Sequence, residues 1–267
     1  MFIEKKPKKS LGQNFLIDKN IIKKIINLGN IEENKTILEI GAGYGSLTTQ
    51  LAKKYPKKIL AIEKDKALSL ILKKKLKFFD NVKVINDDIF NFITNNKLDK
   101  NIIVFGNLPY NIATKILTSL VLIKKWPPWF NLLILMFQKE VADRIIAKHK
   151  SKEFGRLSVL CNWRLEIKKH FDVSKNCFYP KPDVNSSVLT FKPRESEFFF
   201  KNSNNLENVT RILFSNRRKM INKNFIKLFG KNSEVAKKLN LNLKLRPEEL
   251  NHNMYYKIVT EYEKLIY

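Results

Sequence analysis

An apolar run that ends in alternating glycines constrains the fold of this chain more than any other stretch. Residues 36–40 read Thr-Ile-Leu-Glu-Ile, Gly41, Gly43 and Gly45 follow, and residues 46–52 have the pattern of a helix. Glycine permits a tight turn and lets a ligand approach the backbone closely at the start of a helix. The stretch therefore predicts a strand, a ligand-binding loop and a helix of an α/β fold, although a plain β–α turn would have the same pattern.

More runs of strand length follow, separated by helical segments. A short, β-branched run with little charge, such as residues 102–105, is typical of a strand covered on both faces of a parallel sheet. Two later segments alternate in polarity, as antiparallel strands do, and we expect them to form a hairpin that closes the sheet. The seven expected strands are residues 36–40, 58–63, 82–85, 102–105, 132–137, 158–167 and 186–191.

Two of these strands end in carboxylates. Glu63 follows the glycines by about 20 residues, the spacing at which an acid can accept hydrogen bonds from ribose hydroxyls. Asp88 ends the third strand, where it can accept from the adenine amine of the same nucleoside. Its neighbour Asp87 is predicted to cap the next helix. The plainer interpretation is that both aspartates serve only in a turn or a cap.

The fourth strand breaks into Asn107-Leu108-Pro109-Tyr110. Pro109 ends the strand because it has no N–H for the ladder, and it biases Leu108 towards an extended conformation. The Asn107 side chain and nearby carbonyls are then free to point out of the carboxyl edge of the sheet, where ligands bind in open α/β folds. A strand-ending turn without chemistry is the simpler alternative.

These residue types suit methylation of an exocyclic adenine amine. The lone pair of that nitrogen is delocalised into the ring, so the amine is a poor nucleophile until acceptors hold its hydrogens and restore tetrahedral character. The Asn107 side-chain oxygen and a backbone carbonyl can do this without a strong base. The Tyr110 ring can hold the base by stacking once the base has left its helix or loop.

Composition limits the class of protein. Lys and Arg number 51 against 25 Asp and Glu, which gives a net charge of +26 and favours a polyanion such as nucleic acid, although a solvated lysine surface has the same composition. Cys161 and Cys177 form no Cys-x-x-Cys pair and the three histidines are scattered, so no metal site and no disulfide is expected. With neither a membrane-length apolar run nor a secretory signal, the chain is expected to be cytoplasmic.

Composition also predicts two domains. Residues 1–195 form the predicted catalytic α/β domain, which includes the basic arm of residues 5–9. Residues 205–267 have helical periodicity and form the predicted substrate domain. Its cluster Arg217, Arg218 and Lys219 is expected to contact RNA phosphates, unless it is only a solvated face.

Several motifs, taken together in this order, resemble one family closely: the ribosomal RNA adenine N6,N6-dimethyltransferases, and most closely the bacterial small-subunit enzymes linked to kasugamycin sensitivity. The likeness runs from about residue 8 to the C-terminus. The large-subunit erythromycin-resistance enzymes typically have Asn-Ile-Pro-Tyr and lack Gln-Lys-Glu. The motifs are Gly12-Gln13-Asn14-Phe15-Leu16, Glu39-Ile40-Gly41-Ala42-Gly43, Glu63, Asp88, Asn107-Leu108-Pro109-Tyr110, Gln138-Lys139-Glu140-Val141, Gly155-Arg156-Leu157-Ser158 and Phe214-x-x-Arg217-Arg218-Lys219.

The resemblance implies a class I S-adenosylmethionine-dependent methyltransferase with a Rossmann-like seven-stranded sheet and a small helical C-terminal domain. It implies a monomer that dimethylates two adjacent adenosines near the 3′ end of small-subunit (16S) rRNA, late in 30S assembly. The Leu108 carbonyl would hold the target amine with Asn107, and Tyr110 and Phe178 would sandwich the adenine. Asp183 departs from the family, whose members usually have Lys there. The residues implied to line the cofactor are Asn14, Leu16, Gly41, Glu63, Asp88 and Asn107.

Three alternatives are weighed against this hypothesis. A methyltransferase of another nucleic acid would use a similar turn, because Asn-x-Pro-Tyr variants also serve adenine in DNA. An RNA-binding assembly factor without turnover is disfavoured by the intact turn, Glu63 and the glycine loop. A nicotinamide-dependent dehydrogenase is set aside because Ser46 replaces the third glycine of the dinucleotide fingerprint and no hydride-transfer residues are recognisable.

Overall fold

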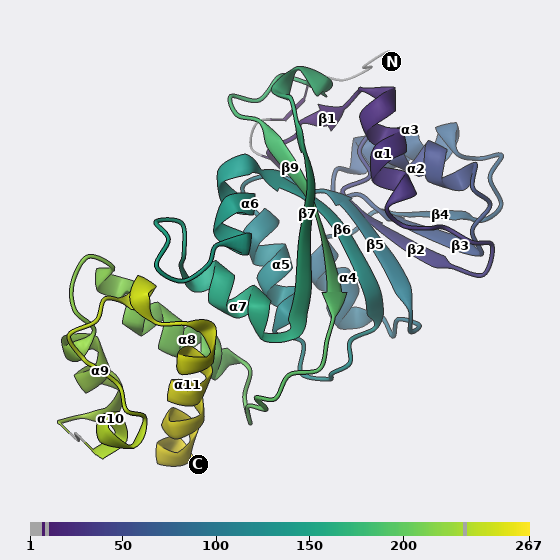
Figure 1. The fold of residues 1–267 in the computed structure, drawn as a ribbon. Helices are drawn as coiled ribbons and strands as arrows, with labels where there is room; N and C mark the ends of the chain where they lie inside the picture. The colour runs from purple at the N-terminus through teal and green to yellow at the C-terminus, as the bar shows by residue number, and fades with distance from the viewer. Residues whose placement is uncertain (1–6, 9–10, 232–233) are drawn as a thin grey trace. The chain divides into compact units, whose positions relative to one another are not determined.

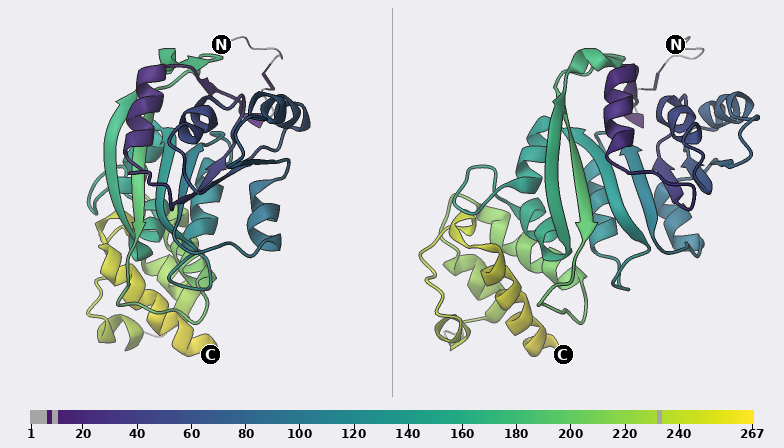
Figure 2. Two further views of the ribbon diagram at one scale, coloured as in Figure 1. Left: turned by 90° about the vertical axis from the view of Figure 1, so that its right-hand side faces the viewer. Right: turned by 45° about the vertical axis from the view of Figure 1, so that its right-hand side comes forward.

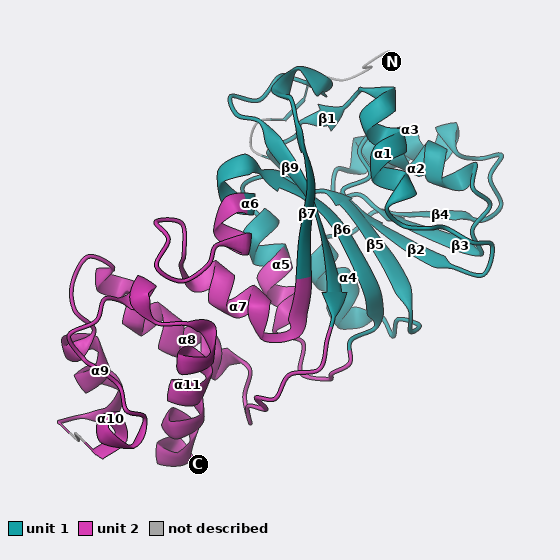
Figure 3. Cartoon of the chain, viewed as in Figure 1, with its two compact units in different colours: residues 1–116, 128–142, 167–193 teal, residues 117–127, 143–166, 194–267 magenta. Residues whose placement is uncertain are grey.

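The computed structural model describes residues 7–8, 11–231 and 234–267, and the chain divides into two compact units (Figure 3). Unit 1 comprises the chain up to Ile116, Pro128–Ala142 and Ile167–Pro193, and unit 2 comprises Leu117–Pro127, Asp143–Glu166 and Arg194–Tyr267. The second unit thus takes in two segments besides the C-terminal region. Of the expected basic arm, only Pro7 and Lys8 belong to the described residues.

A seven-stranded sheet forms the centre of the α/β fold, as predicted (Figure 1). Its strand order is β4-β3-β2-β5-β6-β9-β7, with parallel pairing from β4 to β6 and antiparallel pairing of β6 with β9. A separate two-stranded ribbon pairs β1 (Phe15–Leu16) with β8 (Phe178–Tyr179). The strands of the sheet are β2 (Thr36–Ile40), β3 (Lys58–Ile62), β4 (Val82–Ile85), β5 (Ile102–Asn107), β6 (Phe130–Gln138), β7 (Leu165–Val173) and β9 (Ser186–Pro193).

The register brings the carboxyl ends of the parallel strands together. Ile40 at the end of β2 pairs with Ile62 on one side and with Gly106 on the other, and Ile62 pairs with Ile85. The residues that follow these strands therefore meet at one edge of the sheet. The glycine loop, Glu63, Asp88 and Asn107 all lie at this edge.

Helices cover both faces of the sheet in unit 1 (Figures 1 and 2). Three helices lie on one face, where isoleucines of α1 and leucines of α2 pack against Phe105 and Met136, and Leu72 of α3 packs against Ala61. α4 lies on the opposite face. The helices of this part of the chain are α1 (Lys19–Asn27), α2 (Ser46–Ala52), α3 (Lys66–Lys75), α4 (Ile89–Asn95), α5 (Ala113–Val121) and α6 (Lys139–Ile146).

The prediction of a strand at residues 158–167 is wrong. Residues Arg156–Arg164 form helix α7, and the strand beside β9 is β7, which begins at Leu165. Six of the nine residues of α7 are buried, the polar Ser158 and Arg164 among them, so polar and apolar positions do not separate into two faces of the helix. The periodicity of a buried helix is weak, and a short apolar segment of this kind is easily taken for a strand.

Unit 2 is helical from residue 204 onward, as predicted, and a buried carboxylate joins helices α8 and α11. Glu263 is 5% exposed and accepts hydrogen bonds from the backbone N–H groups of Lys201 and Asn202 and from the Asn205 amide, at 2.8–3.0 Å. These donors precede or begin α8, so α11 supplies an anion to the N-terminal end of α8. The helices are α8 (Asn204–Leu213), α9 (Asn222–Phe229), α10 (Glu234–Lys238) and α11 (His252–Ile266).

Replacing Glu263 should destabilise unit 2. In Glu263→Gln, an N–H₂ group replaces one of the two acceptor oxygens, so a donor then faces a donor and the negative charge is lost. We therefore expect the free energy of unfolding to fall by about 2–3 kcal/mol. Urea denaturation followed by circular dichroism measures it. Glu234→Gln is the control, because Glu234 pairs with Lys237 at an exposed site worth at most about 1 kcal/mol. Equal midpoints for the two variants would contradict the assignment.

Candidate functional site

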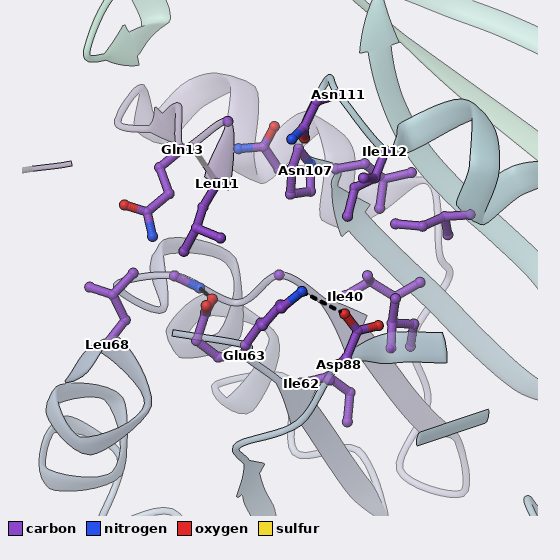
Figure 4. A pocket seen from close by; sticks show the side chains of 18 of the residues that line it. Leu11, Gln13, Ile40, Ile62, Glu63, Leu68, Asp88, Asn107, Asn111 and Ile112 are labelled. Carbon is purple, nitrogen blue, oxygen red and sulfur yellow. Dashed lines mark hydrogen bonds and ion pairs between the residues drawn. The ribbon is translucent and has the colours of Figure 1, made fainter. Parts of the chain in front are cut away.

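A cavity lies at the carboxyl edge of the sheet in unit 1 (Figure 4), and we name it the glycine-loop cavity. Side chains reach it from the N-terminal segment and from the ends of four parallel strands. In the view of Figure 4, Glu63 and Asp88 lie on one side of the cavity and Asn107 on the other. Its wall comprises residues 11–15, Ile40, Gly41, Gly43, residues 62–64, Leu68, residues 87–89, residues 107–109, Asn111, Ile112 and Ile116.

The glycine loop is held by the end of β3. Gly41 and Gly43 have φ angles of 74° and 55°, in the left-handed region that side chains other than glycine rarely adopt. The Gly41 N–H donates to the Ile62 carbonyl at 2.9 Å, and the Gly43 N–H donates to the Glu63 carboxylate at 2.8 Å. The loop and the acid at the end of β3 are thus parts of one arrangement.

Glu63 is a buried carboxylate whose two oxygens both accept from backbone. Besides Gly43, its second oxygen accepts from the Asp65 N–H at 2.8 Å. Burial raises the pKa of Glu63, and these N–H donors act in the opposite direction. Since a carboxylate oxygen has two lone pairs, each oxygen keeps acceptor capacity for a ligand.

Asp88, rather than Asp87, caps the helix that follows β4. The Asp88 carboxylate accepts from the Phe90 N–H at 2.9 Å and lies 2.9 Å from the Lys64 ammonium, whereas Asp87 accepts from the Asp88 N–H. Burial alone would raise the pKa of Asp88, but Lys64 and the Phe90 N–H outweigh it and lower that pKa. The sequence prediction of Asp87 as the cap was therefore wrong by one residue, and both aspartates line the cavity.

The Asn107 side chain has a fixed orientation. Its Nδ2 donates to the Asn14 carbonyl at 2.8 Å. Because a carbonyl only accepts, the nitrogen of the amide must face Asn14, and Oδ1 must face the other way. No described residue donates to this oxygen or to the Leu108 carbonyl. Two acceptors at the end of β5 are therefore available to a ligand.

Tyr110 lines a second cavity, which shares Gly12, Gln13 and Asn14 with the first. This cavity of about 450 Å³, the Tyr110 cavity, is lined by Pro7, Gly12, Gln13, Asn14, Tyr110, Gln138, Pro180, Lys181, Pro182, Asp183 and Val184. The Tyr110 hydroxyl lies 2.6 Å from the Ser186 hydroxyl at the start of β9. Burial raises the pKa of Tyr110 and the Ser186 contact opposes this, so the phenol is neutral at physiological pH.

Two residues that the resemblance placed at the site lie behind its walls. Leu16 and Phe178 face each other across the β1–β8 ribbon, are 2% and 3% exposed, and belong to the core. Successive residues of a strand point to opposite sides, so their neighbours Phe15 and Tyr179 point away from this part of the core. Phe15 lines the glycine-loop cavity and Tyr179 is 47% exposed. The structure thus brings together Asn14, Gly41, Glu63, Asp88, Asn107 and Leu108, with Tyr110 in the adjoining cavity.

An ion pair that sequence reasoning missed fastens the N-terminal segment to the cavity. The Lys8 ammonium lies 2.8 Å from the Asp65 carboxylate, which is only 3% exposed, and the Gln13 amide lies 3.5 Å from the same oxygen. Burial opposes ionisation of Asp65, but Lys8 and the N–H groups of Ala67 and Leu68 lower its pKa. The only signal of this ion pair in the sequence was the presence of an acid, Asp65, two residues after Glu63.

In unit 2, the basic cluster of residues 217–219 is divided in its contacts. The Arg217 guanidinium donates to the Lys152 carbonyl and lies 3.8 Å from the Glu248 carboxylate, so it joins segments of unit 2. Arg218 and Lys219 are exposed, and no ion pair of either is found within the described part of the chain. Within this cluster, Arg218 and Lys219 are therefore the side chains that can meet an external anion.

Neither a metal site nor a membrane-spanning helix occurs among the described residues. No group of three or more His, Cys, Asp or Glu side chains that could hold a metal ion is found among them. None of the helices they form is long and apolar enough to cross a membrane.

Known proteins resemble this chain along its whole length. The family model for ribosomal RNA adenine dimethylase matches residues 4–264. A ribosomal RNA small subunit methyltransferase A from Pelagibacter ubique (strain HTCC1062) is 48% identical over 99% of both chains, and one from Wolbachia sp. subsp. Drosophila simulans (strain wRi) is 38% identical over 97% of this chain and 95% of its own.

Two solved structures share the fold. A dimethyladenosine transferase from Plasmodium falciparum is 27% identical, covers 94% of this chain and 98% of its own, and superposes with a TM-score of 0.78. The 23S rRNA methyltransferase ErmE, at 21% identity, covers 94% and 99% with a TM-score of 0.67. The fold is that of a class I S-adenosylmethionine-dependent methyltransferase. Within that class, the chain belongs to the ribosomal RNA adenine dimethylase family.

Removing the Lys8–Asp65 ion pair should loosen the N-terminal segment. Asp65→Asn keeps a side chain that caps α3 well but loses the charge. Because Lys8 is half exposed, we expect the loss of only about 0.5–1 kcal/mol, seen as roughly two- to fivefold faster amide hydrogen exchange at residues 11–16. Asp65→Asn should have no further effect on exchange in a chain that already carries Lys8→Met. The control is Lys64→Met, which removes the Lys64–Asp88 ion pair instead. Equal exchange in Asp65→Asn and wild type would contradict the role.

Proposed function

We propose that this enzyme transfers methyl groups from S-adenosylmethionine to the N6 amines of two adjacent adenosines near the 3′ end of 16S rRNA. Each adenosine receives two methyl groups, late in assembly of the small subunit, and the enzyme acts as a cytoplasmic monomer. The family and the relatives named ribosomal RNA small subunit methyltransferase A support the substrate. The single observation that carries the chemistry is the orientation of the Asn107 amide by the Asn14 carbonyl.

The residues of the glycine-loop cavity fit the cofactor. S-adenosylmethionine supplies an electrophilic methyl group when bound. Glycines at positions 41 and 43 leave the backbone accessible, and Glu63 keeps acceptor capacity for ribose hydroxyls. Asp88 is ionised and offers an acceptor to the adenine amine. Asn14 and Asn107 complete the proposed set, and Leu16 supports the wall from the core.

Asn107 and Leu108 would prepare the target amine. The Asn107 Oδ1 and the Leu108 carbonyl each accept one of its two hydrogens, which withdraws the nitrogen lone pair from the ring and aims it at the cofactor side. Both acceptors are in place before substrate arrives, so little reorganisation is needed during the reaction. Two neutral acceptors favour a tetrahedral amine without adding a negative charge.

Tyr110 would hold the flipped adenine by stacking. Its hydroxyl is fixed by Ser186, so the ring presents a defined face to the Tyr110 cavity. For Phe178 to complete a sandwich, the β1–β8 ribbon has to move, because the Phe178 ring lies in the core in this structure.

The described residues common to the two cavities are Gly12, Gln13 and Asn14, and none of these has a side chain suited to act as a general base. The raised pKa of Tyr110, in the adjoining cavity, keeps that phenol protonated. Positioning of the amine therefore replaces deprotonation. The nitrogen sheds its proton to water after the methyl group has been transferred.

Methyl transfer to small subunits from unmethylated cells tests the proposal, with naked rRNA, large subunits and DNA as controls.

Asn107→Ala should lower the single-turnover rate by about 10²-fold, as for other preorganised hydrogen-bonding groups. Asn107→Asp should also be slow, because a carboxylate oxygen would face the Asn14 carbonyl and repel it. Tyr110→Phe keeps the stacking ring and should be milder than Tyr110→Ala. Rates are compared at saturating cofactor, and a near-normal Asn107→Ala would place the reaction elsewhere.

The exposed part of the basic cluster should bind RNA phosphates. For the double variant Arg218→Ala/Lys219→Ala, we expect weaker association with small subunits and a log–log salt slope smaller by roughly 0.7–0.9 for each phosphate that the variant no longer neutralises. Cofactor affinity should not change. Arg217→Met is the matched control, since Arg217 contacts Lys152 and Glu248, and it should lower the melting temperature instead. An unchanged slope in the double variant would leave these residues as a solvated surface.

A further inference from the structure

The motif Gln138-Lys139-Glu140 contains a residue that the proposed reaction leaves without a role. Lys139 is accounted for, since its N–H donates to the Asn185 carbonyl at 2.9 Å and its ammonium lies 3.0 Å from the Asp172 carboxylate. Gln138 ends β6, is half-buried and lines the Tyr110 cavity. No described residue bonds to its carboxamide. Gln138 thus brings an unused donor and acceptor to this cavity.

Strand register places Gln138 between the two proposed substrate-holding residues. Asn107 pairs with Met136 across parallel strands, and Met136 and Gln138 point to the same face because strand side chains alternate. The Cα atoms of Asn107 and Gln138 are then about 8 Å apart, from the standard rise and strand spacing. Ser186 pairs with Gln138 on the other side and holds the Tyr110 hydroxyl. Gln138 and Tyr110 therefore line the Tyr110 cavity, which adjoins the glycine-loop cavity of Asn107 and shares Gly12, Gln13 and Asn14 with it.

The chemistry of a carboxamide at this position matches the edge of an adenine. The amine between Asn107 and Leu108 is flanked in the ring by N1 and N7, which only accept hydrogen bonds, and a glutamine amide is a known partner of the adenine edge. We propose that Gln138 is a specificity-determining residue that donates a hydrogen bond to one of these two ring nitrogens of the target adenine. This inference rests on the proposed function and adds a base-reading contact to it.

Such a contact gains importance in the second methyl transfer. After the first transfer, the amine keeps one hydrogen, so one of its two acceptors loses its partner. A bond to the ring nitrogen away from the new methyl group does not depend on those hydrogens. Gln138 then holds the monomethylated base in place for the second transfer.

The test combines atomic changes in the base and in the side chain. Small subunits are reconstituted with rRNA that carries adenosine, 7-deazaadenosine or 1-deazaadenosine at the target positions. With wild-type enzyme, one analogue should lower kcat/KM by about tenfold. Gln138→Met should lower kcat/KM by a similar factor on unmodified subunits, show no further loss on that analogue, and accumulate monomethyladenosine, as seen by mass spectrometry.

Controls separate this inference from the proposed function. Gln138→Glu keeps the shape without the N–H donor and should behave as Gln138→Met does, whereas Gln50→Met, at an exposed position, should match wild type. Cofactor affinity and melting temperature should be unchanged. Three outcomes would overturn the inference. The first is a wild-type kcat/KM for Gln138→Met on unmodified subunits, and the second is a Gln138→Met variant that loses as much kcat/KM on the analogues as wild type does. The third is a wild-type enzyme that loses no kcat/KM on either analogue. Failure of wild type to methylate unmodified subunits would instead overturn the proposed function.

Discussion

The site depends on the parallel pairing of β2, β3, β4 and β5, because this pairing brings their carboxyl ends to one edge. Each strand contributes one feature there: the glycine loop, Glu63, Asp88 and Asn107. None of these would meet the others if a strand slipped by one residue, since side chains alternate between the faces. The paired Ile40, Ile62 and Ile85 are part of this register. The position of every proposed ligand contact is thus set by hydrogen bonds between buried strands.

Charge is distributed differently at the site and in the chain as a whole. The chain has a net charge of +26, yet three carboxylates line the glycine-loop cavity, Glu63, Asp87 and Asp88, and Asp65 lies close by in sequence. Asp65 and Asp88 are balanced locally by Lys8 and Lys64, and Glu63 by backbone N–H groups. These acids are therefore paired or hydrogen-bonded at the proposed site of a small cationic cofactor, while the excess of lysine remains available for a polyanion.

The sequence predicted strand ends where local chemistry decides them, and it named residues that the structure brings to one cavity. Strand ends at Ile40 and Ile85 were read correctly because glycine or acidic turns follow them at once. The helix at Arg156–Arg164 was missed because burial on all sides removes its polar face. The inward position of Phe178 and the internal contacts of Arg217 were not predictable either, since both depend on partners that are distant in sequence, Leu16 and Glu248.

The bond from Asn107 to the Asn14 carbonyl spans 93 residues of chain, and this has a consequence for how activity is acquired. Contacts of such long sequence separation form late in folding, because loop closure must precede them. In a sheet without its docked N-terminal segment, the Asn107 amide could rotate by half a turn and present N–H₂ where the proposed reaction needs an acceptor. An intact sheet is therefore not enough to orient this side chain, because the segment that contains Asn14 must also be in place.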